Sequence, residues 1–390
     1  MVDSIKNSFC YRPPAVETAG YNEFRPFGTA RTAFAARGLT HPGSPTPFIH
    51  PHSLTMSELL TAEQIQPVKE KIDRLQDELN RVLLGRPELH KLVLIGIFSR
   101  GHILLEGVPG VGKTALIQAL GTLLGLKFNR VQFTPDLMPG DITGSHLLQD
   151  TPSGKREMVF QEGPVFTNIL LADEINRASP KTQSALLEAM QERRVTAFGQ
   201  TRPLPEPFFV LASQNPIELE GTYPLPEAQL DRFLFKLHVA SPSAQTLEEI
   251  ITSRRHGVPP TAEFIFSSSE LEKAFALLRN VFLPPAVANY IAKLTAATHP
   301  DSADAPELVK QYVTFGASPR AAIGIAESAR AVALFDGRPT CGFQDVKFVA
   351  PAALNHRLIL SYKAKLDGID SNAIIQNLID SVDKTILSND

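Results

Sequence analysis

Short continuous apolar runs recur between residues 103 and 239, and each run ends at polar or turn-forming residues. Such runs are typical of strands that are buried on both faces of a sheet. Amphipathic helical spacing lies between them, as in Lys181–Arg193, so the pattern predicts an α/β fold. The expected strands are Ile103–Leu105, Phe128–Thr134, Asn168–Ala172, Phe208–Ala212 and Leu234–Val239.

The pattern becomes helical on either side of this region. Upstream, we expect one helix from Pro67, as its first residue, to about Gly85, and a second at about Glu88–Ser99. These helices either form a wall beside the base of a nucleotide or simply pack on the core. Downstream of a boundary at Ser241–Ser243, the chain is expected to be all-helical. The expected helices are Ala244–Arg255, Ser269–Leu278, Pro285–Thr298, Pro319–Phe335 and Gly342–Leu354, with Ser371–Ser388 as an amphipathic helix or a fraying tail.

Two stretches have the pattern of β-hairpins. The first covers residues 146–160 with a turn at Pro152–Lys155, and the second is Arg194–Leu204 around Gly199. The first hairpin is either a decorative loop or a protrusion that touches a partner or a central pore.

Residues 1–55 are rich in proline and have no sustained helical or strand period, which predicts a disordered extension. Its arginines faintly suggest a transit peptide, but Asp3, Glu17 and Glu23 argue against one. Met56 is an alternative start of translation. The expected organisation is an extension over 1–55, a nucleotide-binding domain over 56–240 and a helical lid over 241–390.

Composition adds mainly exclusions. A net charge of −3 in 390 residues gives no general attraction to nucleic acid or to anionic membranes. The two cysteines, Cys10 and Cys341, form no disulfide framework or metal cluster, which fits a reducing cytosol. No apolar run approaches the ~20 residues of a membrane span, so we expect a cytoplasmic protein.

The most informative motif is a G-x-x-x-x-G-K-[ST] sequence between an expected strand and an expected helix. In this context the glycines let backbone N–H groups converge on a phosphate, and the helix N-terminus adds favourable partial charge. Lys113 would reach the β- and γ-phosphates, and the Thr114 hydroxyl would bind Mg²⁺. A glycine-rich turn before an ordinary helix is the alternative. The expected nucleotide-binding residues are Gly107, Val108, Pro109, Gly110, Val111, Gly112, Lys113, Thr114 and Ala115.

Polar side chains at the ends of two later strands are candidates for hydrolysis. Asp173 would hold the Mg²⁺ shell, and Glu174 would orient and activate the attacking water. Asn215 would align that water beside the γ-phosphate. A solvated acidic turn and a simple Asn-Pro turn are the alternatives.

Two arginines complete the candidate set. Arg232 is suited to stabilising a transition state, because its guanidinium contacts phosphate in a bidentate way and keeps its charge. A surface arginine paired with Asp231 is the alternative. Arg320, at an expected helix start, either points into the nucleotide cleft or lies on a helix surface.

Together these residues resemble the AAA+ ATPase superfamily, and closely its MoxR branch. The resemblance runs from about Pro67 to Tyr362. Its most specific segments are Thr134–Leu137, Gly163–Phe166, Ala172–Ala178, Lys181–Glu192, Ala212–Pro216, Glu227–Phe233 and Gly316–Ala321.

The resemblance implies a P-loop αβα sandwich with a five-stranded parallel sheet, an inserted hairpin and a helical lid. It also implies a ring, commonly a hexamer, with ATP at the subunit interfaces. Lys113 and Thr114 match the Walker A positions, and Asp173 and Glu174 the Walker B positions. The remaining matches are Asn215 to sensor 1, Arg232 to the arginine finger and Arg320 to sensor 2, which leaves open whether Arg320 acts on its own nucleotide or a neighbour's.

The function implied by the resemblance is a chaperone-like ATPase that remodels protein complexes, often with a partner carrying a von Willebrand factor A domain. A nucleic-acid-dependent motor and a magnesium-chelatase-type ATPase subunit are the alternatives. Net acidity argues against the motor, although Lys155 and Arg156 lie at the expected hairpin tip. Retention of Glu174 argues against a scaffold that binds ATP without hydrolysing it.

Overall fold

The computed structural model describes residues 59–387 except 109, 151–155, 198, 217–220 and 255–258. The predicted extension over 1–55, Pro109 and the turn at Pro152–Lys155 therefore lie outside the described residues. The described residues belong to one compact unit.

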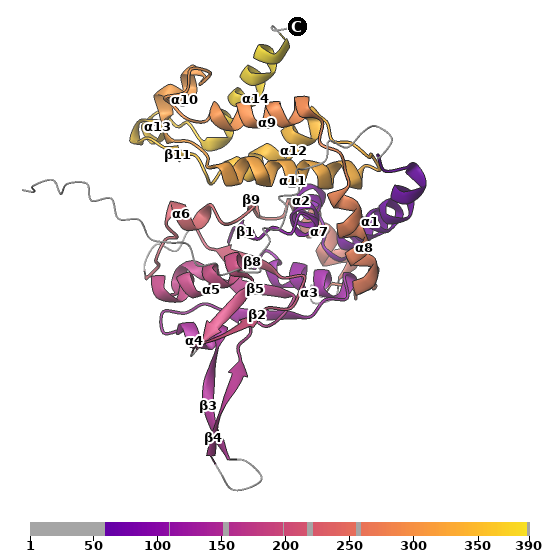
Figure 1. The fold of residues 1–390 in the computed structure, drawn as a ribbon, viewed down its shortest axis with the longest axis vertical. Coiled ribbons are helices and arrows are strands. Elements are labelled where there is room, and N and C mark those ends of the chain that lie inside the picture. Colours follow the sequence, from indigo (N-terminus) through magenta and orange to yellow (C-terminus); the bar gives the residue numbers. More distant parts are fainter. Residues whose placement is uncertain are drawn as a thin grey trace, which may run out of the picture. The chain divides into compact units, whose positions relative to one another are not determined.

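A five-stranded parallel sheet carries the candidate site (Figure 1). The strand order is β2-β5-β8-β1-β9, and the register pairs Leu104 with both Ala212 and Lys236. The five predicted strands are confirmed, with ends that differ from the expected ones by at most two residues. The strands are β1 (Ile103–Glu106), β2 (Phe128–Gln132), β5 (Ile169–Asp173), β8 (Phe209–Gln214) and β9 (Phe235–His238).

The apolar strands supply two cores, one on each face of the sheet. Ile103 and Leu105 pack in the cluster shared with the N-terminal and C-terminal helices, whereas Leu104 packs with Leu186 on the opposite face. Because successive side chains of a strand point to opposite faces, one continuous apolar run fills both cores.

The four longer helices before and within the sheet region follow the predicted pattern, with one correction, whereas the three short helical segments were not predicted. The first helix does not begin at Pro67 but five residues earlier, at Ala62. The Thr61 N–H donates to Gln64 Oε1 at 2.9 Å, which stabilises the earlier start. These helices are α1 (Ala62–Val82), α2 (Pro87–Phe98), α3 (Lys113–Leu123), α4 (Pro139–Thr143), the 3₁₀ turn η2 (Ile175–Arg177), α5 (Pro180–Glu192) and α6 (Glu227–Leu230).

The C-terminal region is helical, as predicted, and also contains a short two-stranded antiparallel sheet. Its strands, β10 (Val313–Phe315) and β11 (Ile359–Leu360), are too short to give a periodic sequence signal. The helices are α7 (Ala244–Ser253), α8 (Ser268–Arg279), α9 (Pro285–Ala296), α10 (Glu307–Tyr312), α11 (Pro319–Phe335), α12 (Phe343–Leu354), α13 (Tyr362–Leu366) and α14 (Ser371–Leu387).

Both predicted hairpins are present. The first is β3 (Gly144–Asp150) with β4 (Arg156–Glu162), and it projects from the sheet domain (Figure 1). The second is β6 (Arg194–Ala197) with β7 (Gln200–Pro203). The first hairpin exposes four large apolar side chains, and these are Leu147, Leu148, Met158 and Val159.

Helix α2 joins the sheet to the C-terminal helices. Phe98 at its end makes edge-to-face contacts with Phe266, Phe275 and Phe335, with ring centroids 5.2–6.0 Å apart. None of the described helices has the length and apolar character that crossing a membrane requires.

Candidate functional site

The phosphate loop lies between β1 and α3, as the motif predicts. Gly110 and Gly112 have φ angles of 80° and 90°, a conformation that other residues adopt only with strain. The space where a Cβ atom would lie at either glycine has no other atom within 4 Å. The loop therefore presents open backbone towards the adjacent cavity.

Lys113, the first residue of α3, carries the positive charge of this loop. Its ammonium group donates to the Gly107 carbonyl, and burial lowers its pKa, while the nearby carboxylates of Asp173 and Glu174 partly oppose that shift. A phosphate bound beside Lys113 would favour the charged form of this partly buried ammonium.

The two candidate carboxylates are held by Ser213, which the sequence analysis gave no role of its own. The Ser213 hydroxyl donates to Asp173 Oδ1 at 2.5 Å and accepts the Glu174 N–H at 2.9 Å. Glu174 itself has a φ of 55°, a rare backbone conformation for a residue other than glycine. Strained backbone of this kind clusters at functional sites and persists only when neighbouring contacts hold it.

Strand β2 and the turn η2 supply further partners that the sequence analysis did not identify. Arg130 pairs with Asp173 Oδ2 at 2.8 Å. Gln132 and Arg177 donate to Glu174 Oε2 at 2.8 and 3.0 Å. The available signal was the two-residue period of the predicted strand, because it places Arg130 and Gln132 on one face.

These groups meet in one cavity of about 480 Å³. It is lined by Lys113 and Thr114 of the phosphate loop, by Asp173 and Glu174 at the end of β5, and by the buried Asn215 after β8. Five predicted site residues from three distant segments of the chain are thus brought together. The carboxyl ends of parallel strands are where ligands bind in open α/β sheets.

The oxygen donors in this cavity fit Mg²⁺. The Thr114 hydroxyl and the Asp173 carboxylate are hard oxygen ligands, and Mg²⁺ is usually bound by one or two such groups together with phosphates. Within the described part of the chain, no cluster of three or more His, Cys, Asp or Glu side chains is arranged to hold a metal ion. The two oxygen ligands that the chain does supply, Thr114 and Asp173, fit a cation that completes its shell with a phosphate ligand.

A second, more apolar cavity of about 320 Å³ also borders the phosphate loop. The two cavities share Gly110, Gly112, Lys113 and Ala115. Leu83 and Leu84, at the junction of α1 and α2, and Leu89 of α2 line the apolar one. Together the cavities offer an apolar slot and a polar pocket that share one phosphate loop.

Arg232 and Arg320 lie elsewhere. Both line a third cavity of about 310 Å³, and neither lines a cavity next to the phosphate loop. Arg232 donates to the Leu187 carbonyl at 2.8 Å, and its buried Nε atom has no hydrogen-bond partner. This cavity contains two carboxylates, Asp231 and Glu327, and five arginines, which are Arg100, Arg193, Arg232, Arg320 and Arg357.

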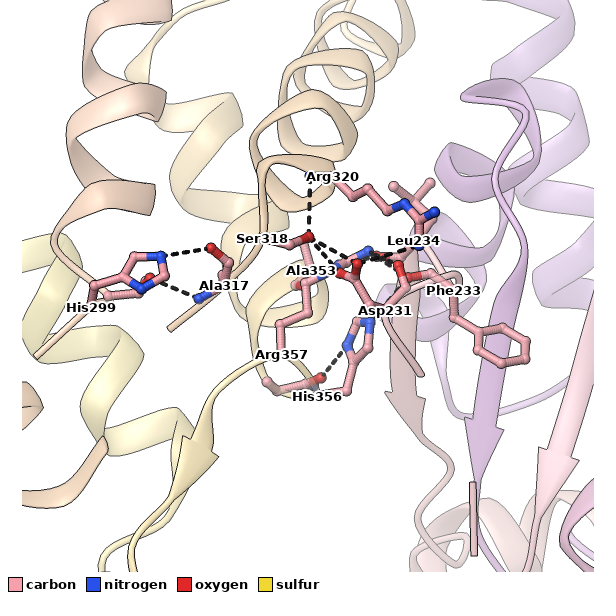
Figure 2. A network of polar contacts seen from close by, with 12 residues as sticks. Asp231, Phe233, Leu234, His299, Ala317, Ser318, Arg320, Ala353, His356 and Arg357 are labelled. Carbon is pink, nitrogen blue, oxygen red and sulfur yellow. Dashed lines mark hydrogen bonds and ion pairs between the residues drawn. The ribbon is translucent and has the colours of Figure 1, made fainter. Parts of the chain in front are cut away.

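Asp231 does not pair with Arg232. It accepts hydrogen bonds from Ser318 at 2.9 Å and from Arg357 Nε at 2.8 Å, and it lies 3.5 Å from Arg320 (Figure 2). The Arg357 side chain is 3% exposed and also donates to the carbonyls of Phe233 and Leu234. This network joins the helical region to the segment that carries Arg232, and burial lowers the pKa of Arg357 despite the opposing effect of Asp231.

We expect the substitution Asp231→Asn to lower the free energy of unfolding by about 3 kcal/mol, because it leaves the buried Arg357 without its carboxylate. Urea denaturation measures the change. Asp73→Asn is a matched control, since it removes the partner of Lys69 from a half-exposed pair one helical turn apart and should cost about 0.5 kcal/mol or less. Equal small losses in both variants would mean that the Asp231 network does not stabilise the fold.

The chain is similar to known proteins over most of its length. Residues 102–235 match the family described as ATPase family associated with various cellular activities (AAA), and residues 305–378 match the AAA lid domain. The chain is 45% identical over 322 residues to Chaperone MoxR1 of Mycobacterium tuberculosis, across 82% of this chain and 84% of that protein. It is 40% identical to the uncharacterized protein YeaC of Bacillus subtilis, across 82% of this chain and 96% of that protein.

A solved structure has the same fold. The crystal structure of a candidate ATPase from Cytophaga hutchinsonii is 40% identical in sequence, with a TM-score of 0.76, and the match covers 82% of this chain and 96% of that chain. The matched regions contain every predicted site residue, from the phosphate loop to Arg320.

Proposed function

Because the chain belongs to the MoxR family of AAA+ ATPases, we propose that it binds ATP with Mg²⁺ and hydrolyses it to drive the remodelling of partner proteins. The observation that carries this proposal is the cavity in which Lys113, Thr114, Asp173, Glu174 and Asn215 meet. These residues supply a cation for phosphate, two metal ligands, a carboxylate for the attacking water and an amide to align it.

Binding and positioning come first. The open backbone at Gly110 and Gly112 and the Lys113 ammonium bind the β- and γ-phosphates. Thr114 and Asp173 would hold Mg²⁺, which when bound offsets negative charge on the phosphate oxygens. The apolar slot beyond the loop receives the base.

Hydrolysis then depends on Glu174. Its carboxylate orients the attacking water, and Asn215 fixes that water relative to the γ-phosphate. The hydrogen bonds from Gln132 and Arg177 hold the carboxylate in one position until a nucleotide binds.

Arg232 and Arg320 would act on the nucleotide of a neighbouring subunit. Their cavity shares no residue with the two cavities at the phosphate loop, and it contains more arginines than carboxylates. An anion from another subunit suits that imbalance. Such head-to-tail contacts close into a ring, and a hexamer is the ring that we propose.

The exposed hairpin β3–β4 supports contact with a partner protein. Its apolar side chains pair across the strands, Leu147 with Val159 and Leu148 with Met158, and all four are exposed. A partner carrying a von Willebrand factor A domain and a cytoplasmic location remain parts of this proposal.

We expect the purified chain to release phosphate from ATP, to lose this activity in EDTA, and to recover it when Mg²⁺ is added in excess. A coupled phosphate-release assay measures the rate. Hydrolysis that persists in EDTA would contradict the assignment of Thr114 and Asp173 as metal ligands. Absence of hydrolysis at every protein concentration, with and without Mg²⁺, would contradict the proposed function.

A further inference from the structure

The apolar slot beside the phosphate loop contains an imidazole. His90 of α2 lines this cavity, yet the residue is only 3% exposed. Leu83, Leu84 and Leu89 line the same cavity. A polar ring among apolar side chains favours one orientation of a bound ligand, because a ligand that leaves the ring without a hydrogen bond binds with less favourable free energy.

The hydrogen bond to Asn80 determines which nitrogen of the ring carries the proton. His90 Nδ1 lies 2.7 Å from Asn80 Oδ1, and an amide oxygen only accepts hydrogen bonds. Nδ1 is therefore the donor, and Nε2 of the neutral ring is an acceptor. Within the described part of the chain, Nε2 has no hydrogen-bond partner.

The surroundings keep the ring neutral. Burial lowers the pKa of His90 to about 4, and the positive charge of Arg86 adds to this shift. At neutral pH the imidazole therefore offers a lone pair and no positive charge to the cavity.

The ring is also held in a fixed relation to the phosphate loop. Arg86, just before α2, donates to the Val111 carbonyl at 2.6 Å. Asn80 belongs to α1 and His90 to α2, so the pair joins two packed helices. A nucleotide bound through its phosphates would therefore meet His90 at one defined position.

We propose that His90 selects the base: its Nε2 atom accepts a hydrogen bond from the 6-amino group of adenine, so the site takes adenine nucleotides in preference to guanine nucleotides. Guanine has a carbonyl oxygen at this position, and two acceptors would face each other. The inference rests on the proposed function, since it assigns the base to the apolar cavity.

The test compares ADP, GDP and purine riboside 5′-diphosphate, which lacks the 6-amino group, by isothermal titration calorimetry on the full chain. We expect ADP to bind about ten-fold more tightly than purine riboside diphosphate, the effect of one net hydrogen bond in a buried site. GDP should bind more weakly than ADP by at least the same factor. In His90→Leu, the ADP preference over purine riboside diphosphate should fall to about one-fold.

Two further variants separate base reading from packing. His90→Gln keeps an acceptor and should retain part of the preference for ADP. Leu89→Met changes the same cavity without a polar atom, so it should leave the preference unchanged.

The outcomes distinguish this inference from the proposed function. If no diphosphate binds to the wild-type chain, the proposed nucleotide site fails. If ADP binds but wild type does not prefer it to purine riboside diphosphate, or if His90→Leu keeps the preference, the role of His90 is overturned and the nucleotide site stands. The wild-type comparison decides the question even where a variant does not fold.

Discussion

Replacing Glu174 with glutamine is expected to lower the rate of ATP hydrolysis by about 100- to 10,000-fold, with ATP binding retained. Glutamine preserves the size of the side chain and its hydrogen bonds, but its amide cannot take a proton from water. Because the Glu174 backbone is held by Ser213, the left-handed turn should survive the substitution. The variant should therefore trap the nucleotide-bound state.

The measurement pairs calorimetric ATP binding with steady-state phosphate release. Glu63→Gln makes the same chemical change on an exposed position in the first turn of α1 and should leave both quantities unchanged. Turnover in Glu174→Gln close to the wild-type rate would remove Glu174 from the catalytic role. Loss of ATP binding would instead mean that the carboxylate mainly shapes the site.

The sequence predicts the sheet and the centre of this site because both depend on local patterns. A run such as Ile169–Ala172 identifies a strand buried on both faces, and the residues that follow it must lie at the ligand-binding edge of a parallel sheet. Five strands follow from this reasoning, and so do Asp173, Glu174 and Asn215 at the strand ends. The start of α1 was predicted wrongly. Pro67 is favoured as a first helical residue, but the hydrogen bond between Thr61 and Gln64 stabilises a start at Ala62.

The partners of the site residues could not be predicted in the same way. Gln132 contacts Glu174 across 42 residues of sequence, and Arg357 contacts Asp231 across 126. No periodic pattern records which polar side chains meet over such separations. The local sequence suggests that Arg232 pairs with Asp231. In the structure Arg232 instead donates to the Leu187 carbonyl, and Asp231 pairs with Arg320, which lies 89 residues further along the chain.

Packing also explains why the role of Arg320 was open in the sequence. The position of a helix start relative to the phosphate loop depends on how the helical region docks on the sheet. Asp231 forms ion pairs with Arg320 and Arg357, and both arginines line the same cavity as Arg232. Arg320 does not line either cavity at the phosphate loop. We therefore propose that Arg320, like Arg232, acts across a subunit interface.

The substitution Arg232→Ala is expected to lower ATP hydrolysis by about 1,000-fold or more while each subunit still binds ATP, since an arginine supplied to the transition state contributes at least that factor. The binding residues of the phosphate cavity do not include Arg232, so nucleotide affinity should change little. Arg194→Ala, which removes an exposed arginine that pairs with Glu192, is the matched control and should keep most of the activity.

Mixing the two inactive variants tests whether Arg232 acts between subunits. An Arg232→Ala subunit keeps Glu174, and a Glu174→Gln neighbour keeps Arg232, so their shared interface contains one complete set of residues. With equal amounts and random assembly, about a quarter of the interfaces in a head-to-tail ring are complete, and activity should recover in proportion. Recovery can arise only if the arginine and the glutamate of one active site come from different chains. A mixture as inactive as its components would mean that Arg232 serves its own subunit, which the separation of the two cavities argues against.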